Sequence, residues 1–108
     1  MEAPGSNPGI PTLSMDIAQF QALMRTTYGE RDRERGLART FAWLVEECGE
    51  LSRAVFRGSH DDQVREFADV LAWLASLADQ AGVDLAEAAA RYANGCPRCG
   101  TTPCECAR

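Results

Sequence analysis

Apolar residues recur every three or four positions along most of the chain, which is the spacing of one face of an α-helix. This pattern holds in residues 16–28, 40–57 and 61–81, and a shorter alanine-rich segment follows in residues 84–92. No segment shows the strict alternation of apolar and polar residues that is typical of a half-buried strand. The pattern therefore predicts an all-α domain that folds as a four-helix bundle.

The residues between these segments predict how neighbouring helices connect. Residues 29–36 are polar and rich in arginine, and we expect a connecting segment there. The next connection is short, because Gly58 is a typical helix end and Ser59 is a typical helix start. His60, the only histidine, is expected in this turn as a loop residue. A short turn makes the second and third helices antiparallel neighbours.

The two ends of the chain differ in composition from the helical domain expected in residues 15–94. Residues 1–14 are rich in proline, glycine and serine, and we expect them to form a flexible N-terminal tail. Residues 95–108 form a cysteine-rich C-terminal tail with glycine and proline between the cysteines. A helical body this small has a marginal core of its own, so oligomerisation or a metal ion is expected to support it.

The third predicted helix is apolar over nearly half of its circumference. The centre of this face contains Val64, Phe67, Leu71, Leu74 and Ala78. A helix on the surface of a domain needs a narrower apolar stripe. We therefore expect more than one neighbour to bury this face, one of them from another subunit.

Composition and charge exclude several classes of protein. The chain has 108 residues and a net charge of −5, which argues against a nucleic acid polymer as a partner. No apolar run approaches the roughly 18–20 residues that cross a bilayer. Residues 1–14 lack the basic start and apolar stretch of a secretion signal. We expect a cytoplasmic protein without a membrane partner.

Four of the five cysteines lie close together in the C-terminal tail. They are Cys96, Cys99, Cys104 and Cys106. A reducing compartment disfavours disulfides, and four thiolates joined by short turns suit one tetrahedral zinc ion. The pattern predicts a zinc knuckle, while a frayed thiol-rich tail and ligands shared between two chains remain alternatives.

Five acidic residues form two groups on the second and third predicted helices. The groups are Glu46, Glu47 and Glu50, and Glu66 and Asp69. Like charges three or four residues apart on a helix cost a few tenths of a kcal/mol per pair, roughly. Because the helices are antiparallel, the groups should face each other at similar distances from the turn. A solvated acidic face is one interpretation, and a site for Mg²⁺ or Mn²⁺ is the other.

The acidic residues also match a known pair of motifs. Glu46-Glu47-Cys48-Gly49-Glu50 and Glu66-Phe67-Ala68-Asp69 resemble the E-E-x-x-E and E-x-x-D motifs of the MazG-like nucleotide pyrophosphohydrolases. This family belongs to the all-α NTP pyrophosphatase superfamily, and the resemblance covers about residues 16–94. It implies Mg²⁺-dependent hydrolysis of an NTP or dNTP to the monophosphate and pyrophosphate, in nucleotide-pool house-cleaning. It also implies a homodimer or a dimer of dimers.

The resemblance further implies roles for the acidic residues. Glu46 would orient or deprotonate the attacking water, or bind a further metal ion. The Mg²⁺ ligands would be Glu47, Glu50, Glu66 and Asp69. The sequence departs from the family where relatives often have asparagine and this chain has Asp79, which puts contacts to the base or sugar in question. Arg91 is the nearest match to a basic residue near the end of the family's last helix.

Six further residues are candidates for binding the substrate. Arginines can hold the phosphates through paired hydrogen bonds, and tryptophans can form walls around a base. The candidates are Arg31, Arg33, Arg35, Arg39, Trp43 and Trp73. The alternatives are a solvated charged loop for the arginines and core packing for the tryptophans.

Two other functions remain open at this point. A catalytically weak relative would bind a nucleotide or a protein and use the zinc knuckle for docking. In a zinc-dependent regulatory protein, the helical bundle would serve only for dimerisation.

Overall fold

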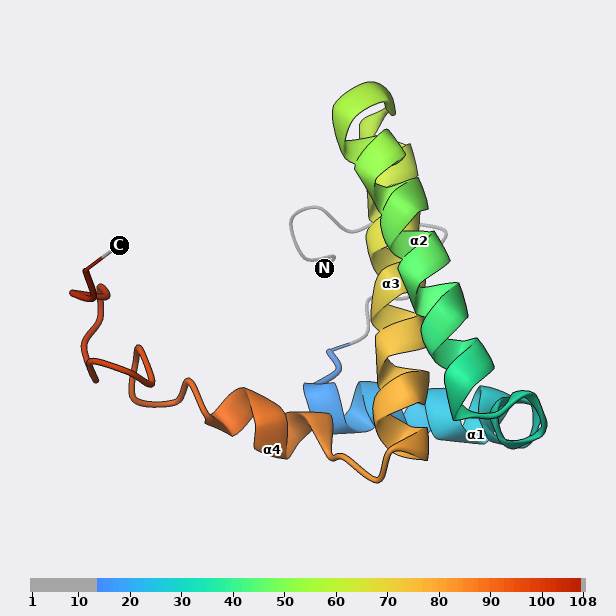
Figure 1. The fold of residues 1–108 in the computed structure, drawn as a ribbon, viewed down its shortest axis with the longest axis horizontal. Coiled ribbons are helices and arrows are strands. Elements are labelled where there is room, and N and C mark those ends of the chain that lie inside the picture. Colours follow the sequence, from blue (N-terminus) through green and yellow to red (C-terminus); the bar gives the residue numbers. More distant parts are fainter. Residues whose placement is uncertain (1–13, 108) are drawn as a thin grey trace, which may run out of the picture.

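The computed structural model describes residues 14–107, so the predicted tail in residues 1–14 lies outside it except for Ser14. The described residues form four helices and no strand, which confirms the predicted all-α class. The helices are α1 (Ile17–Arg35), α2 (Leu37–Arg57), α3 (His60–Gln80) and α4 (Leu85–Ala90). Helices α2 and α3 form an antiparallel hairpin, and α1 crosses its open end (Figure 1). None of these helices combines the length and the hydropathy that a membrane span requires.

Reciprocal hydrogen bonds fix the beginnings of α1 and α3. The Asp16 side chain accepts the backbone N–H of Gln19 at 2.7 Å, and the Gln19 side chain accepts the N–H of Asp16 at 2.8 Å. Ser59 and Asp62 exchange the same pair of bonds, at 3.2 Å and 3.0 Å. Each pair satisfies two N–H groups that have no partner within the helix. The short turn before α3 is therefore set by local sequence.

Helix α1 is longer than the sequence pattern predicted. We expected a connection in residues 29–36, but α1 continues to Arg35, and α2 begins at Leu37 rather than Thr40. The arginine and glutamate residues of this stretch are good helix formers, which favours continuation. Gly36 alone separates the two helices, and its φ of 86° lies in the region that glycine adopts without strain. Residues 29–35, predicted as part of a loop, are thus the last turns of α1.

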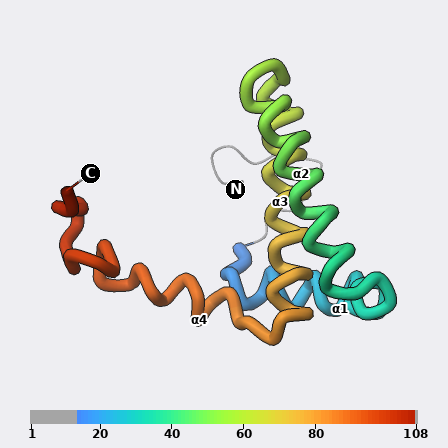
Figure 2. Tube along the Cα trace, viewed as in Figure 1, coloured from blue at the N-terminus to red at the C-terminus, as the bar shows by residue number. Residues whose placement is uncertain are grey.

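Smaller differences from the prediction occur at two other helix ends. His60 is the first residue of α3 and not a turn residue. Helix α4 ends at Ala90 rather than near Tyr92. It begins at Leu85, and the side chain of Asp84 just before it accepts the N–H of Ala86 at 2.9 Å. As the trace in Figure 2 shows, α4 is a short link that leads from the bundle to the C-terminal tail.

The predicted apolar face of α3 is largely uncovered in the single chain. Val64, Phe67, Leu71 and Leu74 are between 40% and 57% exposed. Ala78, from the same face, is buried, and the other buried apolar residues of the described chain are Ala54 and Ala75. Apolar side chains of this size normally lie inside a protein, and contiguous exposed patches mark contact surfaces. The helices of one chain leave this face available for another partner.

Buried polar side chains join the helices where they cross. The Thr40 hydroxyl, fully buried at the start of α2, accepts a hydrogen bond from Gln80 Nε2 at the end of α3. Gln21 of α1 is 3% exposed and makes two bonds to the start of α4. Its Nε2 donates to the Val83 carbonyl at 2.8 Å, and its Oε1 accepts the N–H of Leu85 at 2.9 Å.

Replacing Gln21 with alanine should therefore weaken the fold. Gln21→Ala would leave the Val83 carbonyl and the Leu85 N–H without their partner, at a cost of about 1–3 kcal/mol. The measurement is the free energy of unfolding in urea at fixed protein concentration. Glu34→Ala, at an exposed position of the same helix, is the control and should stay within about 0.5 kcal/mol of wild type. Equal effects of the two substitutions would contradict this role for Gln21.

Candidate functional site

The α2–α3 hairpin brings together acidic side chains from both of its helices. Glu47 of α2 and Glu66 and Asp69 of α3 each place one carboxylate oxygen within 4.8 Å of the others. All three residues are half-buried. Because both helices are packed along their length, the carboxylates cannot move apart without a change of side-chain rotamer. We refer to Glu47, Glu66 and Asp69 as the carboxylate cluster.

Charge repulsion and partial burial make the carboxylate cluster unfavourable when all its members are ionised. Burial raises the pKa of Glu47 above its ordinary value, and the charges of Asp69 and Glu66 raise it further. Glu66 Oε2 is buried and has no hydrogen-bond partner within the described residues. A buried carboxylate oxygen without a donor normally has a proton, a water or a cation as its neighbour.

The cluster fits a hard divalent cation. Mg²⁺ prefers oxygen ligands at about 2.0–2.1 Å, which places them up to about 4 Å apart. Three oxygens within 4.8 Å of one another approach this arrangement, and the unpartnered Glu66 oxygen offers a ligand. A divalent cation would also neutralise the charges that raise the pKa of Glu47.

The structure does not place the other two predicted acidic residues in the carboxylate cluster. Glu50 lies about one helical turn beyond Glu47 toward the hairpin turn, and its Oε2 accepts from Arg53 Nη1 at 3.3 Å. Its charge nevertheless contributes to the raised pKa of Glu47. Glu46 is exposed on α2.

A cavity adjoins the cluster on the side of α1. It has a volume of about 250 Å³, and Asp69 is part of its wall. The Trp73 ring in this wall stacks on Trp43 with ring centres 6.0 Å apart, and the Arg35 guanidinium lies 4.7 Å from the Trp73 ring centre. The lining residues are Tyr28, Arg31, Asp32, Arg35, Asp69, Ala72, Trp73 and Ser76.

Only part of the predicted substrate-binding set lines this cavity. Arg31, Arg35 and Trp73 line it. Arg33, Arg39 and Trp43 are exposed and lie outside its wall, although the Trp43 ring stacks on Trp73. Tyr28, Asp32 and Ser76 are cavity residues that the sequence analysis did not identify. The spacing of Tyr28 and Asp32 could have identified them, because residues 28, 31, 32 and 35 lie on one face if the helix is continuous.

A second groove adjoins the cluster on the side of the hairpin turn. It has a volume of about 310 Å³, and Glu66 is part of its wall. Three arginines that the sequence analysis did not assign to the site line it: Arg53, Arg57 and Arg65. Arg65 is held loosely, since its Nη2 lies 3.6 Å from Asp62 Oδ1 and its side chain is 66% exposed. The carboxylate cluster thus lies between an aromatic cavity and an arginine-lined groove.

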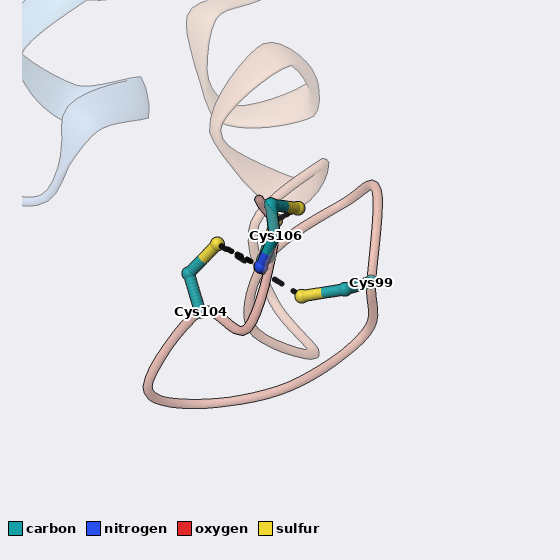
Figure 3. Close-up of side chains that lie close together, drawn as sticks. Cys99, Cys104 and Cys106 are labelled. Carbon is teal, nitrogen blue, oxygen red and sulfur yellow. Dashed lines mark hydrogen bonds between the residues drawn. The ribbon is translucent and has the colours of Figure 1, made fainter. Parts of the chain in front are cut away.

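The structure also brings the four C-terminal cysteines together within one chain, where they form a cluster that could bind a metal ion. Their sulfur atoms all lie within 4.8 Å of one another, and Figure 3 shows Cys99, Cys104 and Cys106 gathered in the folded-back tail. A hydrogen bond with the Thr101 hydroxyl lowers the pKa of Cys99 to about 5, and hydrogen bonds from the backbone N–H groups of Glu105 and Thr101 also contribute. The neighbouring thiols Cys104, Cys96 and Cys99 raise the pKa of Cys106 to about 11.

Removing one carboxylate from the cluster should stabilise the metal-free protein and weaken its response to Mg²⁺. In Glu47→Gln the repulsion is smaller, so the melting temperature at neutral pH should rise. Because the pKa of Glu47 is raised in the folded protein, protonation of Glu47 stabilises the fold. This contribution to stability is fully present below the ordinary pKa of 4.5 and is lost as the pH increases through the raised pKa. The advantage of the variant should therefore appear above that pKa, as measured by thermal unfolding from pH 4 to 8.

The same melting experiment with Mg²⁺ provides the second half of this test. Wild-type protein should gain about 2.7 kcal/mol when the Mg²⁺ concentration is 100 times the dissociation constant, and Glu47→Gln should gain far less. Glu30→Gln, at an exposed position of α1, should behave as wild type. A Mg²⁺ response in Glu47→Gln as large as in wild type would contradict the assignment.

Comparison with known protein families agrees with this geometry. The family model of the MazG nucleotide pyrophosphohydrolase domain matches residues 35–98. This range is more than half of the chain and includes α2 and α3, which supply the carboxylate cluster, as well as α4. No curated protein matches the chain. The match over the greater part of the chain shows that this protein belongs to the MazG nucleotide pyrophosphohydrolase domain family.

Proposed function

We propose that this protein hydrolyses a nucleoside triphosphate, NTP or dNTP, to the monophosphate and pyrophosphate in a Mg²⁺-dependent reaction. The observation that carries the proposal is the carboxylate cluster, three oxygen ligands from two packed helices beside a cavity with aromatic and arginine side chains. Membership of the pyrophosphohydrolase family supports it. The proposed role is nucleotide-pool house-cleaning. Five free cysteines favour a reducing compartment, so we infer that this role is carried out in the cytoplasm.

Glu47, Glu66 and Asp69 would hold Mg²⁺, with Mn²⁺ as an alternative of similar ligand preference. Glu50 would join them as a fourth ligand by a rotamer change that breaks its 3.3 Å contact with Arg53. The contact is exposed, so its loss costs little. When bound, the metal ion supplies positive charge for the phosphate oxygens and lowers the pKa of a water molecule.

Glu46 would orient the attacking water and accept its proton. Its carboxylate is exposed and lies outside the cluster, next to Glu47 in the sequence. The water oxygen would bond to the α-phosphorus, the bond from that phosphorus to the bridging oxygen would break, and pyrophosphate would leave. A carboxylate in this role contributes about 10²–10⁴-fold to the rate.

The order of residues along α3 supports a direction for the bound nucleotide. Asp69 and Trp73 line the aromatic cavity, whereas Arg65 and Glu66 line the groove nearer the hairpin turn. The nucleoside would occupy the cavity, with its base against Trp73, and the α-phosphate would reach the cluster. The β- and γ-phosphates would then extend into the groove, whose wall contains three arginines and no aromatic residue, because guanidinium groups pair well with phosphate oxygens.

We also propose that the apolar face of α3 binds a second copy of the chain, as a homodimer or a dimer of dimers. Four apolar side chains of α3, Val64, Phe67, Leu71 and Leu74, are exposed along one face of a helix that carries two cluster residues. A partner on this face would bury apolar surface that the single chain leaves in water. Zinc on the C-terminal cysteines would have no part in the hydrolysis, since that tail extends away from the hairpin (Figure 1).

Asp69→Asn should lose the proposed activity while remaining folded. Removing a group that stabilises charge in a transition state lowers kcat by roughly 10²–10³-fold. Pyrophosphate release from each of the common NTPs and dNTPs in Mg²⁺ is the measurement, and helicity by circular dichroism is the check on folding. Asp61→Asn, exposed on the same helix, should retain wild-type activity. Full activity in Asp69→Asn, or none in wild type with any nucleotide, would refute the proposal.

The direction of the nucleotide has its own test in product inhibition. Arg57→Gln should weaken inhibition by pyrophosphate by about tenfold, the loss of about 1.4 kcal/mol that a charged hydrogen bond supplies. Inhibition by the nucleoside monophosphate should stay unchanged. Tyr28→Ala should show the opposite selectivity, since Tyr28 lines the cavity.

Arg33→Gln is the matched control for Arg57→Gln, because Arg33 is exposed on α1 and lines neither space. Arg33→Gln should therefore leave pyrophosphate inhibition unchanged. If Arg31→Gln, on the cavity side, weakens pyrophosphate inhibition and Arg57→Gln does not, the nucleotide lies the other way round. That result would leave the proposed hydrolysis itself intact.

A further inference from the structure

The C-terminal tail folds into a closed loop that ordinary hydrogen bonds define. The Cys96 N–H donates to the Thr101 carbonyl at 3.1 Å, and the Gly100 N–H donates to the Cys96 carbonyl at 2.7 Å. Gly95 has a φ of 95°, and a Cβ atom there would collide with Thr101 and Thr102. The sequence is therefore adapted to this loop, which argues against the frayed tail considered from sequence.

The distances between the four sulfur atoms match a tetrahedral metal site. Cys96 Sγ lies 3.7 Å from Cys106 Sγ, and Cys99 Sγ lies 3.9 Å from Cys104 Sγ. Zinc–sulfur bonds of about 2.3 Å at tetrahedral angles place the sulfurs about 3.8 Å apart. A disulfide would require a separation of about 2.05 Å. The spacing is therefore that of four ligands around one ion and not that of bonded pairs.

Backbone N–H groups point at two of these sulfurs. The N–H of Glu105 donates to Cys99 Sγ and the N–H of Cys106 donates to Cys104 Sγ, each at 3.3 Å. Such donors stabilise a thiolate, the form of cysteine that binds metals. They also orient the ligands, as other hydrogen bonds around metal sites do.

We propose that the four cysteines of a single chain bind one Zn²⁺ ion as a closed structural site, independent of the carboxylate cluster. The ligands are Cys96, Cys99, Cys104 and Cys106. Soft thiolates select zinc or iron among the common divalent ions, and a complete set of four leaves no position for substrate. Because all four come from one chain, sharing between two chains is unnecessary.

The position of the site indicates what the ion stabilises. The tail extends from α4 away from the hairpin (Figure 1), so its loops receive little support from the bundle. A segment of this length has no core of its own, and a metal ion is a usual substitute. Zinc would hold residues 96–106 in one conformation, including Arg98, which is exposed between the first two ligands.

Elemental analysis of the purified full-length protein tests the proposal. Wild type should contain about one zinc per chain, and Cys99→Ser should lose nearly all of it. Cys48→Ser is the matched control, because Cys48 is exposed on α2 and outside the cluster. Asp69→Asn should also keep its zinc, which excludes binding at the carboxylate cluster. Pyrophosphohydrolase activity, where wild type has it, should be unchanged in Cys99→Ser.

Two readouts on wild type make the test independent of how the variant folds. Replacement of zinc by Co²⁺ should give the visible absorption of a tetrahedral thiolate complex, and a strong chelator should make trypsin cleave after Arg98 much faster. Iron in place of zinc, zinc retained in Cys99→Ser, or a metal-free protein with four titratable thiols in the folded tail would each overturn the proposal.

Discussion

The repulsion among Glu47, Glu66 and Asp69 is the constraint on which the proposed chemistry depends. Two packed helices of 21 residues each hold these carboxylates in place, and burial denies them full hydration. A proton relieves part of the strain, which is why the pKa of Glu47 is raised. A divalent cation would relieve more, because it would also provide a partner for the buried Glu66 oxygen. A stable hairpin with an unfavourable cluster is expected where function, and not stability, determines the residues.

The fold and the centre of the site could be predicted from sequence because both depend on helical periodicity and a short turn. Convergence of Glu47 with Glu66 and Asp69 needed only an antiparallel hairpin. The cavity could not be predicted, because it requires α1 to continue to Arg35 and to place Tyr28 and Asp32 on one face of the helix. Gly29 and the polar, arginine-rich residues after it predicted a connection. In the structure Gly29 is instead buried within a continuous helix, so packing outweighs the local signal.

The arginines of the groove were missed for a different reason. Arg57 at the last turn of α2 has an ordinary explanation in the helix dipole, and Arg53 pairs with Glu50 three residues before it. Neither feature points to a ligand until the hairpin places both residues beside Arg65 and Glu66. The sequence instead indicated the four arginines near the expected loop, because they lie close together along the chain. In the structure Arg31 and Arg35 line the cavity, whereas Arg33 and Arg39 do not.

The two candidate metal sites differ in what their ligand sets leave free. Three carboxylates, or four with Glu50, would fill only part of the coordination shell of a six-coordinate ion, so phosphate oxygens and water could complete it. Four thiolates would fill the shell of a tetrahedral ion and exclude both. Hard oxygen ligands suit Mg²⁺ and soft sulfur ligands suit Zn²⁺, so each site would also disfavour the other's ion. The open set is therefore the one that would suit catalysis, while the closed set would serve only to hold the tail in shape.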